Sequence, residues 1–148
     1  DYNIFLEALT ILCRKLSKEM AKDGEGASKL LVCKVSGAKT EKDAKGVAKS
    51  VVCSSLLKAA MFGSDANWGR VLCAIGYSGC DVDINKVDVS FASKAGKVDV
   101  CKNGAGIDFS EEIAKTVLTE DEIDIVVELN DGNGVAEAYG CGLTYEYV

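Results

Sequence analysis

The spacing between apolar residues changes along the chain, and this change limits the folds that the chain can adopt. Apolar residues recur every three or four positions over residues 2–22, about 41–53 and about 68–78, which is typical of helices with one buried face. From residue 81 onward the interval falls to two, which is typical of half-buried strands. The alternating apolar residues are Val82, Ile84, Val87, Val89, Phe91, Val98 and Val100. This order predicts an α+β fold, with a mixed β-sheet and helices packed mainly on one face.

The remaining segments are assigned from shorter patterns. We expect a strand over 28–37, either a helix or a strand over 56–62, a short helix over 110–118, a strand over 123–129 and a return strand over 135–148. Residues 130–134 read NDGNG, and because Asn and Gly accept positive φ angles we expect a hairpin turn there. Thr40 with Asp43, and Asn67, are placed to cap the helices that follow them.

Charge excludes two classes of partner. The formal net charge is −6, and the lysines are spread along the chain instead of clustered. Nucleic-acid binding relies on clustered Lys and Arg, so we expect no nucleic-acid partner. An anionic membrane surface has little to attract, and no apolar run reaches the roughly 18 residues that cross a bilayer, so we expect no membrane association.

The seven cysteines and the absence of histidine bear on metal sites and compartment. No Cys-x-x-Cys pair is present, and mixed Cys/His zinc sites are impossible without histidine, so we expect no metal site. Seven reduced thiols acting as small apolar side chains fit a cytoplasmic protein better than a disulfide framework does. Without histidine, the chain by itself also shows no complete set of catalytic groups.

The most unusual local segment is KDGEGASK, residues 22–29. Glycines on both sides of Glu25 would allow the backbone to approach a ligand closely and would place one carboxylate where it can pair with an ammonium group. The alternative is a plain helix end with a solvated glutamate, since glycine commonly follows a helix.

Two further segments have structural alternatives. Asn67-Trp68-Gly69-Arg70 could line a pocket, but a helix cap and a buried aromatic anchor are the commoner roles for such residues. The carboxylates at 81, 83 and 120–124 invite a calcium site, yet the ligand spacing of an EF-hand is absent, so a solvated acidic face is the simpler interpretation.

Several segments together resemble the ornithine acetyltransferase (bifunctional glutamate N-acetyltransferase) family. The similar segments are residues 5–9, 23–29, 62–70, 72–79, 120–123 and 140–148, in the family's order and across nearly the whole chain. One departure is Ala66, where the family commonly has proline. The resemblance places the chain in the carboxy-terminal part of the second, or beta, subunit.

The resemblance also implies a chemistry. In the family a precursor cleaves itself before a threonine, which becomes the nucleophile and carries acetyl from N-acetylornithine to glutamate in arginine biosynthesis. It implies that Glu25 binds substrate, that the nucleophilic threonine lies outside this chain, and that no cofactor is needed, with acetyl-CoA as a possible second donor. The implied partners are the alpha subunit and the amino-terminal part of the beta subunit, in a hetero-oligomer.

Two units are expected on this basis. Residues 1–28 would form a helix and the Gly-Glu-Gly loop, packing on the missing catalytic part, and residues 29–148 would form the α+β domain. The start at Asp1 without Met and the strand-like end at Val148 suggest that sequence is missing at both ends, so that these residues alone would be inactive. The alternative is a stand-alone α+β binding or interaction domain without catalysis.

Overall fold

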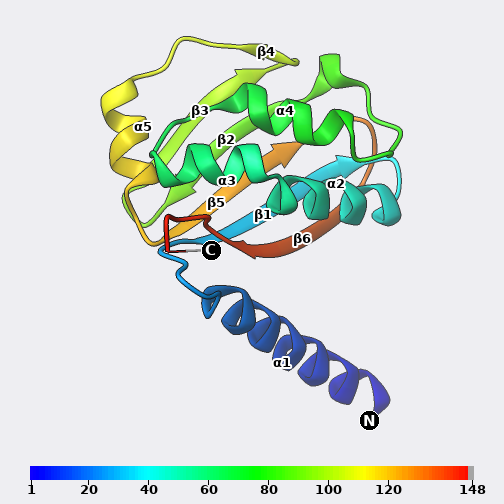
Figure 1. Ribbon diagram of the computed structural model, residues 1–148. Helices are drawn as coiled ribbons and strands as arrows, with labels where there is room; N and C mark the ends of the chain where they lie inside the picture. Colours follow the sequence, from blue (N-terminus) through cyan, green and yellow to red (C-terminus); the bar gives the residue numbers. More distant parts are fainter. Residues whose placement is uncertain (147–148) are drawn as a thin grey trace.

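A six-stranded mixed sheet with four helices on one face forms the body of the protein, seen in a computed structural model that describes residues 1–146 (Figure 1). The strand order is β4-β3-β2-β5-β1-β6, with β1 parallel to β5 and the other neighbours antiparallel. The strands are β1 (Leu30–Ala38), β2 (Asp88–Ser93), β3 (Gly96–Lys102), β4 (Ala105–Gly106), β5 (Glu122–Glu128) and β6 (Gly134–Cys141). The predicted α+β class is confirmed.

The covering helices are α2 (Glu41–Cys53), α3 (Ser55–Phe62), α4 (Trp68–Gly76) and α5 (Glu111–Leu118). Each begins at a side chain that accepts a hydrogen bond from the backbone N–H three residues on, and the caps are Thr40, Ser54, Asn67 and Ser110. The predicted caps Thr40 and Asn67 are therefore confirmed. The ambiguous segment 56–62 is helical because Ser54 starts a new helix directly after α2.

The core lies between these helices and the facing side of the sheet. Alternate residues of β5, Ile123, Ile125 and Val127, are fully buried there, and the intervening side chains point to the other face. Buried residues at helical spacing, such as Val47 and Val51 of α2, pack against them. Burial of one face of α2, α5 and β5 explains why the two-residue and helical periods in the sequence predict the layers.

The predicted hairpin at residues 130–134 is wrong, because β5 and β6 are not neighbours. Strand β1 lies between them, pairing parallel with β5 and antiparallel with β6. The segment crosses the end of β1, where the Asp131 N–H donates to the Gly37 carbonyl at 2.8 Å. Gly134 passes so close to Thr40 that a Cβ would lie 2.5 Å from its carbonyl carbon, so glycine is needed for this close approach.

Two strand boundaries also differ from the prediction. The alternating apolar pattern from residue 81 predicts a strand, but strand β2 begins only at Asp88. Residues before it form a 3-10 turn (Ile84–Lys86), which Asp83 caps by accepting from the Asn85 N–H at 3.1 Å. The return strand ends at Cys141, where the chain turns toward the segment after the first helix, and residues 147 and 148 lie outside the described residues.

The first helix, α1 (Tyr2–Lys22), stands apart from the layers and extends away from the sheet (Figure 1). None of its residues is buried. Its polar side faces the body, where Lys18 pairs with Glu122 of β5, and this hydrogen bond raises the pKa of Lys18. Its apolar side is left open to solvent. Within residues 1–146, no helix combines the length and the apolar character that a bilayer crossing requires.

Candidate functional site

Glu25 occupies a tight turn between α1 and β1. The Ala27 N–H donates to the Gly24 carbonyl at 2.9 Å, which closes a four-residue turn with Glu25 and Gly26 at its centre. Gly26 has a φ of +65°, a conformation that costs glycine little and other residues more. The entry to the turn is fixed as well, because the Asp23 N–H still donates to the Glu19 carbonyl of α1 at 3.0 Å.

Both glycines of this turn lie against the segment that follows β6, residues 141–146. A Cβ on Gly24 would lie 2.7 Å from the Cys141 Sγ, and one on Gly26 would lie 2.8 Å from the Glu146 Cβ. The glycines therefore allow a close approach between this turn and the segment after β6, whereas the approach to a ligand stays a prediction. This segment and the turn form one unit at the end of the sheet where β1 begins and β6 ends.

Residues 141–146 lie alongside the turn, and two hydrogen bonds and one aromatic contact hold them there. The Gly142 N–H donates to the Lys29 carbonyl at 2.7 Å, and the Thr144 hydroxyl donates to the Gly26 carbonyl at 2.6 Å. The Tyr145 ring then meets Phe62 of α3 edge to face, with the ring centroids 5.1 Å apart.

Lys29 ties the beginning of β1 to the helix layer. Its Nζ donates to the carbonyls of Met61 and Leu118, each at 2.6 Å, and to the Ser64 hydroxyl at 3.0 Å. Met61 and Leu118 lie in the last turns of α3 and α5, where carbonyls lack partners within the helix and a cation is favourable. Partial burial lowers the pKa of Lys29. The residues that follow Glu25 are thus anchored on two helices.

The Glu25 side chain itself is exposed. Within the described part of the chain, no hydrogen bond or ion pair joins its carboxylate to another residue. An open hollow of about 560 Å³ runs along the last two turns of α1, lined by Leu16, Glu19, Met20, Lys22 and Asp23. Its lining ends two residues before Glu25. The arrangement presents an unpaired carboxylate on a rigidly held turn, available to an ammonium group.

The segment Asn67-Trp68-Gly69-Arg70 has a structural role. The Asn67 side chain accepts from the Arg70 N–H at 3.2 Å and donates to Asp65 at 3.0 Å, which orders the start of α4. The Trp68 indole packs on the core and directly over Gly106 of β4. The Arg70 guanidinium donates to the Leu56 carbonyl at 2.6 Å. Capping and packing therefore use the polar and aromatic groups of this segment.

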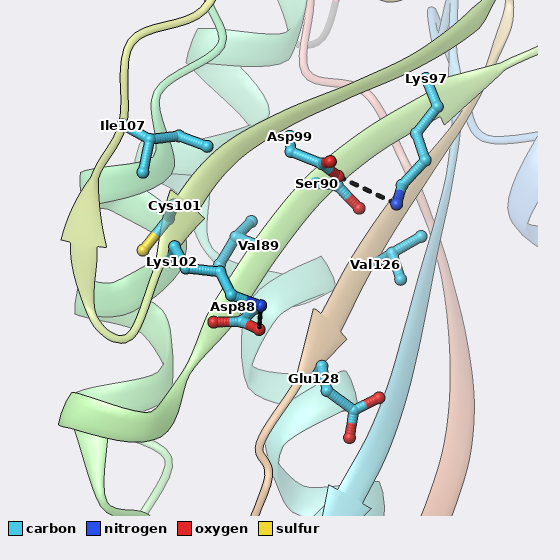
Figure 2. A pocket seen from close by; sticks show the side chains of 10 residues that line it. All are labelled: Asp88, Val89, Ser90, Lys97, Asp99, Cys101, Lys102, Ile107, Val126 and Glu128. Carbon is cyan, nitrogen blue, oxygen red and sulfur yellow. Dashed lines mark hydrogen bonds and ion pairs between the residues drawn. The ribbon is translucent and has the colours of Figure 1, made fainter.

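A second concave region of about 320 Å³ lies on the open face of the sheet, over β2, β3 and β5 (Figure 2). Four of its charged groups form two ion pairs: Lys97 with Asp99 at 2.9 Å and Lys102 with Asp88 at 2.6 Å (Figure 2). Glu128, at the end of β5, accepts from Ser36 of β1. Glu128 and Glu122 lie at opposite ends of β5. Glu122 is the register neighbour of Leu30 in β1, close to the Glu25 turn. The two regions are separate.

Most of the acidic residues considered for calcium are paired with lysines, and Asp83 instead accepts from Asn85. Asp81 accepts from Lys39, Asp124 from Lys34 and Glu120 from Lys94. Over residues 1–146 no group of three or more potential metal ligands comes together. The sequence predicted a solvated acidic face, and the structure adds that lysines on neighbouring elements partner most of these carboxylates.

All seven cysteines are free thiols, but only some are the small apolar side chains predicted. Cys33 and Cys101 are buried, and burial raises the pKa of each. Cys13, Cys53 and Cys73 are exposed, so the prediction is wrong for these three.

Sequence patterns identified Glu25 but missed the groups that hold its turn. Thr144 lies 118 residues from Gly26, and although it falls in the similar segment 140–148, nothing in the sequence indicates that it contacts this turn. Lys29 could be singled out only as part of the motif that contains Glu25, since its three acceptors come from different helices and a loop.

Comparison with known proteins gives a consistent match over the whole chain. Residues 1–148 match the family described as the ArgJ family. The arginine biosynthesis bifunctional protein ArgJ 1 of Clostridium acetobutylicum is 53% identical over 148 residues, which are 100% of this chain and 36% of that protein. A glutamate N-acetyltransferase of Methanopyrus kandleri is 44% identical over 144 residues, which are 97% of this chain and 37% of that protein.

A solved structure agrees as well. The crystal structure of the arginine biosynthesis bifunctional protein argJ from Bacillus halodurans matches with a TM-score of 0.93 and 45% identity, over 100% of this chain and 68% of that chain. The chain thus spans a little over a third of the length of the curated relatives and about two-thirds of that crystallised chain.

Proposed function

Because the chain belongs to the ArgJ family, we propose that it forms the carboxy-terminal part of the second subunit of an acetyltransferase that acts in arginine biosynthesis. The complete enzyme moves an acetyl group from N-acetylornithine to glutamate. Relatives at 53% and 44% identity named for arginine biosynthesis and for glutamate N-acetyl transfer support this assignment.

The proposed reaction proceeds in two acyl transfers. A threonine hydroxyl on a segment outside this chain attacks the acetyl carbonyl of N-acetylornithine, so that an ester C–O bond forms, the amide C–N bond breaks and ornithine leaves with the proton. The α-amine of glutamate then attacks the acetyl-threonine ester, forming N-acetylglutamate and restoring the hydroxyl. The terminal amine of that threonine serves as the base, which agrees with a chain that lacks histidine. The scheme uses no resident cofactor, and acetyl-CoA is an alternative acetyl donor.

In this scheme Glu25 binds the side-chain ammonium of N-acetylornithine, because the α-amine of glutamate must be unprotonated to attack the ester. The observation that carries the proposal is an exposed carboxylate without a partner among residues 1–146, on a turn held between two close glycine contacts. A charged hydrogen bond to an ammonium is stronger than a neutral one, so this contact would select N-acetylornithine over N-acetyl amino acids that lack a side-chain amine.

The remainder of the family's polypeptide is the proposed partner of α1. The Bacillus halodurans match covers all of this chain, α1 included, and about a third of that crystallised chain lies beyond it. The unburied apolar side of α1 offers a surface for the rest of the family's polypeptide, and we propose that the alpha subunit and the first part of the beta subunit supply the contact. A cytoplasmic location is proposed with it, supported by the seven free thiols.

The test uses the complete native gene product that contains these residues. It should transfer acetyl from N-acetylornithine to glutamate, and Glu25→Gln should lower kcat/KM at least about tenfold, which corresponds to about 1.4 kcal/mol. Glu111→Gln, an exposed glutamate on α5, is the matched control and should leave kcat/KM unchanged. Full activity of Glu25→Gln would show that Glu25 does not bind substrate. Failure of the complete product to transfer acetyl would instead favour a binding domain.

A further inference from the structure

Thr144 makes a hydrogen bond that joins the segment after β6 to the turn between α1 and β1. Its hydroxyl donates to the Gly26 carbonyl at 2.6 Å and accepts from the Glu146 N–H at 3.2 Å. A hydroxyl has one proton to donate, so the short bond to Gly26 fixes its orientation. The carbonyl that it holds belongs to the residue directly after Glu25.

From these contacts we infer that Thr144 is a positioning residue for Glu25. The inference rests on the proposed role of Glu25 in substrate binding and extends it to a residue whose side chain need not touch the substrate. The Thr144 hydroxyl fixes the exit of the turn, and the hydrogen bond from Asp23 to Glu19 fixes its entry. Glu25 lies between these two fixed points.

Several contacts hold the segment after β6 along the turn, and among them Thr144 provides the side-chain hydrogen bond. The contact between Gly142 and Lys29 is a backbone hydrogen bond, and Cys141 meets Gly24 through van der Waals contact. Neither depends on Thr144. Loss of its hydroxyl would therefore leave the segment in place and free the Gly26 carbonyl, so that the turn could move.

Thr144 also lies outside the hydrophobic core. Its side chain is partly exposed, and its partner Gly26 is exposed as well. Neither Thr144 nor Gly26 belongs to the hydrophobic core that β1, β5 and α2 form. Substitution of Thr144 should therefore affect the placement of Glu25 more than it affects folding.

The test compares Thr144→Val, which keeps the shape of the side chain and removes the hydroxyl, with Thr144→Ser, which keeps the hydroxyl. In the complete protein, Thr144→Val should raise KM for N-acetylornithine about tenfold and change kcat less, as expected for a lost orientation of a binding group. Thr144→Ser should return KM to within about twofold of the parent. An unchanged KM in Thr144→Val, or a serine variant as poor as the valine variant, would overturn the inference.

A double-variant cycle separates this inference from the proposed function. If Thr144 acts through Glu25, Thr144→Val should have little further effect once Glu25→Gln is present. An equal loss from Thr144→Val in both backgrounds would overturn the positioning role while leaving the role of Glu25 intact. Full activity of Glu25→Gln alone would overturn the proposed role of Glu25, and the positioning inference with it.

A second measurement needs no activity and uses the 148-residue chain. A glutamate-specific protease cuts after Glu25 only when the turn opens, so the cutting rate reports how firmly the turn is held. The rate at Glu25 should rise several-fold, about threefold or more, in Thr144→Val and stay at the parental value in Thr144→Ser. The cutting rate at Glu111 serves as the internal control for general unfolding. Equal rates at Glu25 in all three proteins would contradict the inference.

Discussion

At the scale of single residues, the turn that carries Glu25 is built from groups of two kinds. Glycines at 24 and 26 give the backbone room to pass Cys141 and Glu146, and a positive φ is needed only at Gly26. The Thr144 hydroxyl donates a hydrogen bond to the turn itself. The Lys29 ammonium donates to three acceptors and so anchors the residues that follow the turn. The glycines and Glu25 stand together in the sequence and could be singled out from it. The contacts that the other groups make with this turn could not be predicted, because only the fold brings them there.

The conformation of Gly26 leads to a stability prediction. Gly26→Ala places a Cβ 2.8 Å from the Glu146 Cβ and forces alanine to a φ of +65°, so we expect a loss of about 1–2 kcal/mol in the free energy of unfolding. Urea denaturation of the 148-residue chain measures it. Gly76→Ala is the matched control, since a Cβ there meets nothing within 4 Å, and alanine suits a helix. Equal stability of Gly26→Ala and the parent would contradict the geometry of the turn.

At the scale of elements, the sequence predicted individual helices well and their connections less well. Helix α2 begins and ends where its apolar period and the Thr40 cap predicted. The crossing between β5 and β6 was mistaken for a hairpin, because the same Asn and Gly residues that suit a tight turn also suit a close crossing over β1. Which strand lies between two others is a long-range property that local turn residues do not encode.

Asp88 joins three of these elements and gives a pH-dependent prediction. It accepts hydrogen bonds from Lys102 of β3, from the Asn103 N–H and from Asn130 of the crossing. Burial raises the pKa of Asp88, but these hydrogen bonds outweigh it, so the pKa lies below its usual value of 3.8. A depressed folded-state pKa means that the carboxylate stabilises the fold above the unfolded-state pKa, and that this stabilisation is lost as pH falls through the folded-state pKa.

Asp88→Asn tests this prediction. The variant should unfold at lower urea concentration than the parent at about pH 6, and the difference should shrink by about pH 3. Asp99→Asn, which removes one exposed carboxylate paired only with Lys97, is the control and should differ less from the parent at about pH 6. A difference between Asp88→Asn and the parent that stays constant with pH would rule out the proposed contribution.

At the scale of the whole molecule, the two parts of the chain differ in how they are stabilised. The α+β body buries a continuous core, and alternation and helical periods were enough to predict its class. Helix α1 is equally periodic in sequence, yet its apolar side is covered by nothing within residues 1–146. The sequence therefore predicted that α1 is amphipathic, but a periodic pattern does not identify the surface on which a helix packs.

The open side of α1 leads to the last prediction. Phe5, Leu9, Leu12 and Leu16 fall on one side of the helix, opposite Lys18, and are 65%, 42%, 52% and 54% exposed. Such a continuous apolar stripe marks an interaction surface, so the isolated chain should self-associate through it. Light scattering should show a mass that rises with concentration above that of the 15.6 kDa monomer.

Substitutions on the two sides of α1 can locate the association surface. Leu9→Asp with Leu12→Asp should return the mass to that of a monomer, because burying either carboxylate in an apolar contact is unfavourable. The matched control places aspartate on the polar side, at Asn3 and Ser17, and should leave the association unchanged. If the parent is strictly monomeric at every concentration, or if the control pair abolishes association as fully as the apolar pair, the stripe is not the contact surface. The proposal that the rest of the family's polypeptide covers α1 would then lose its main support.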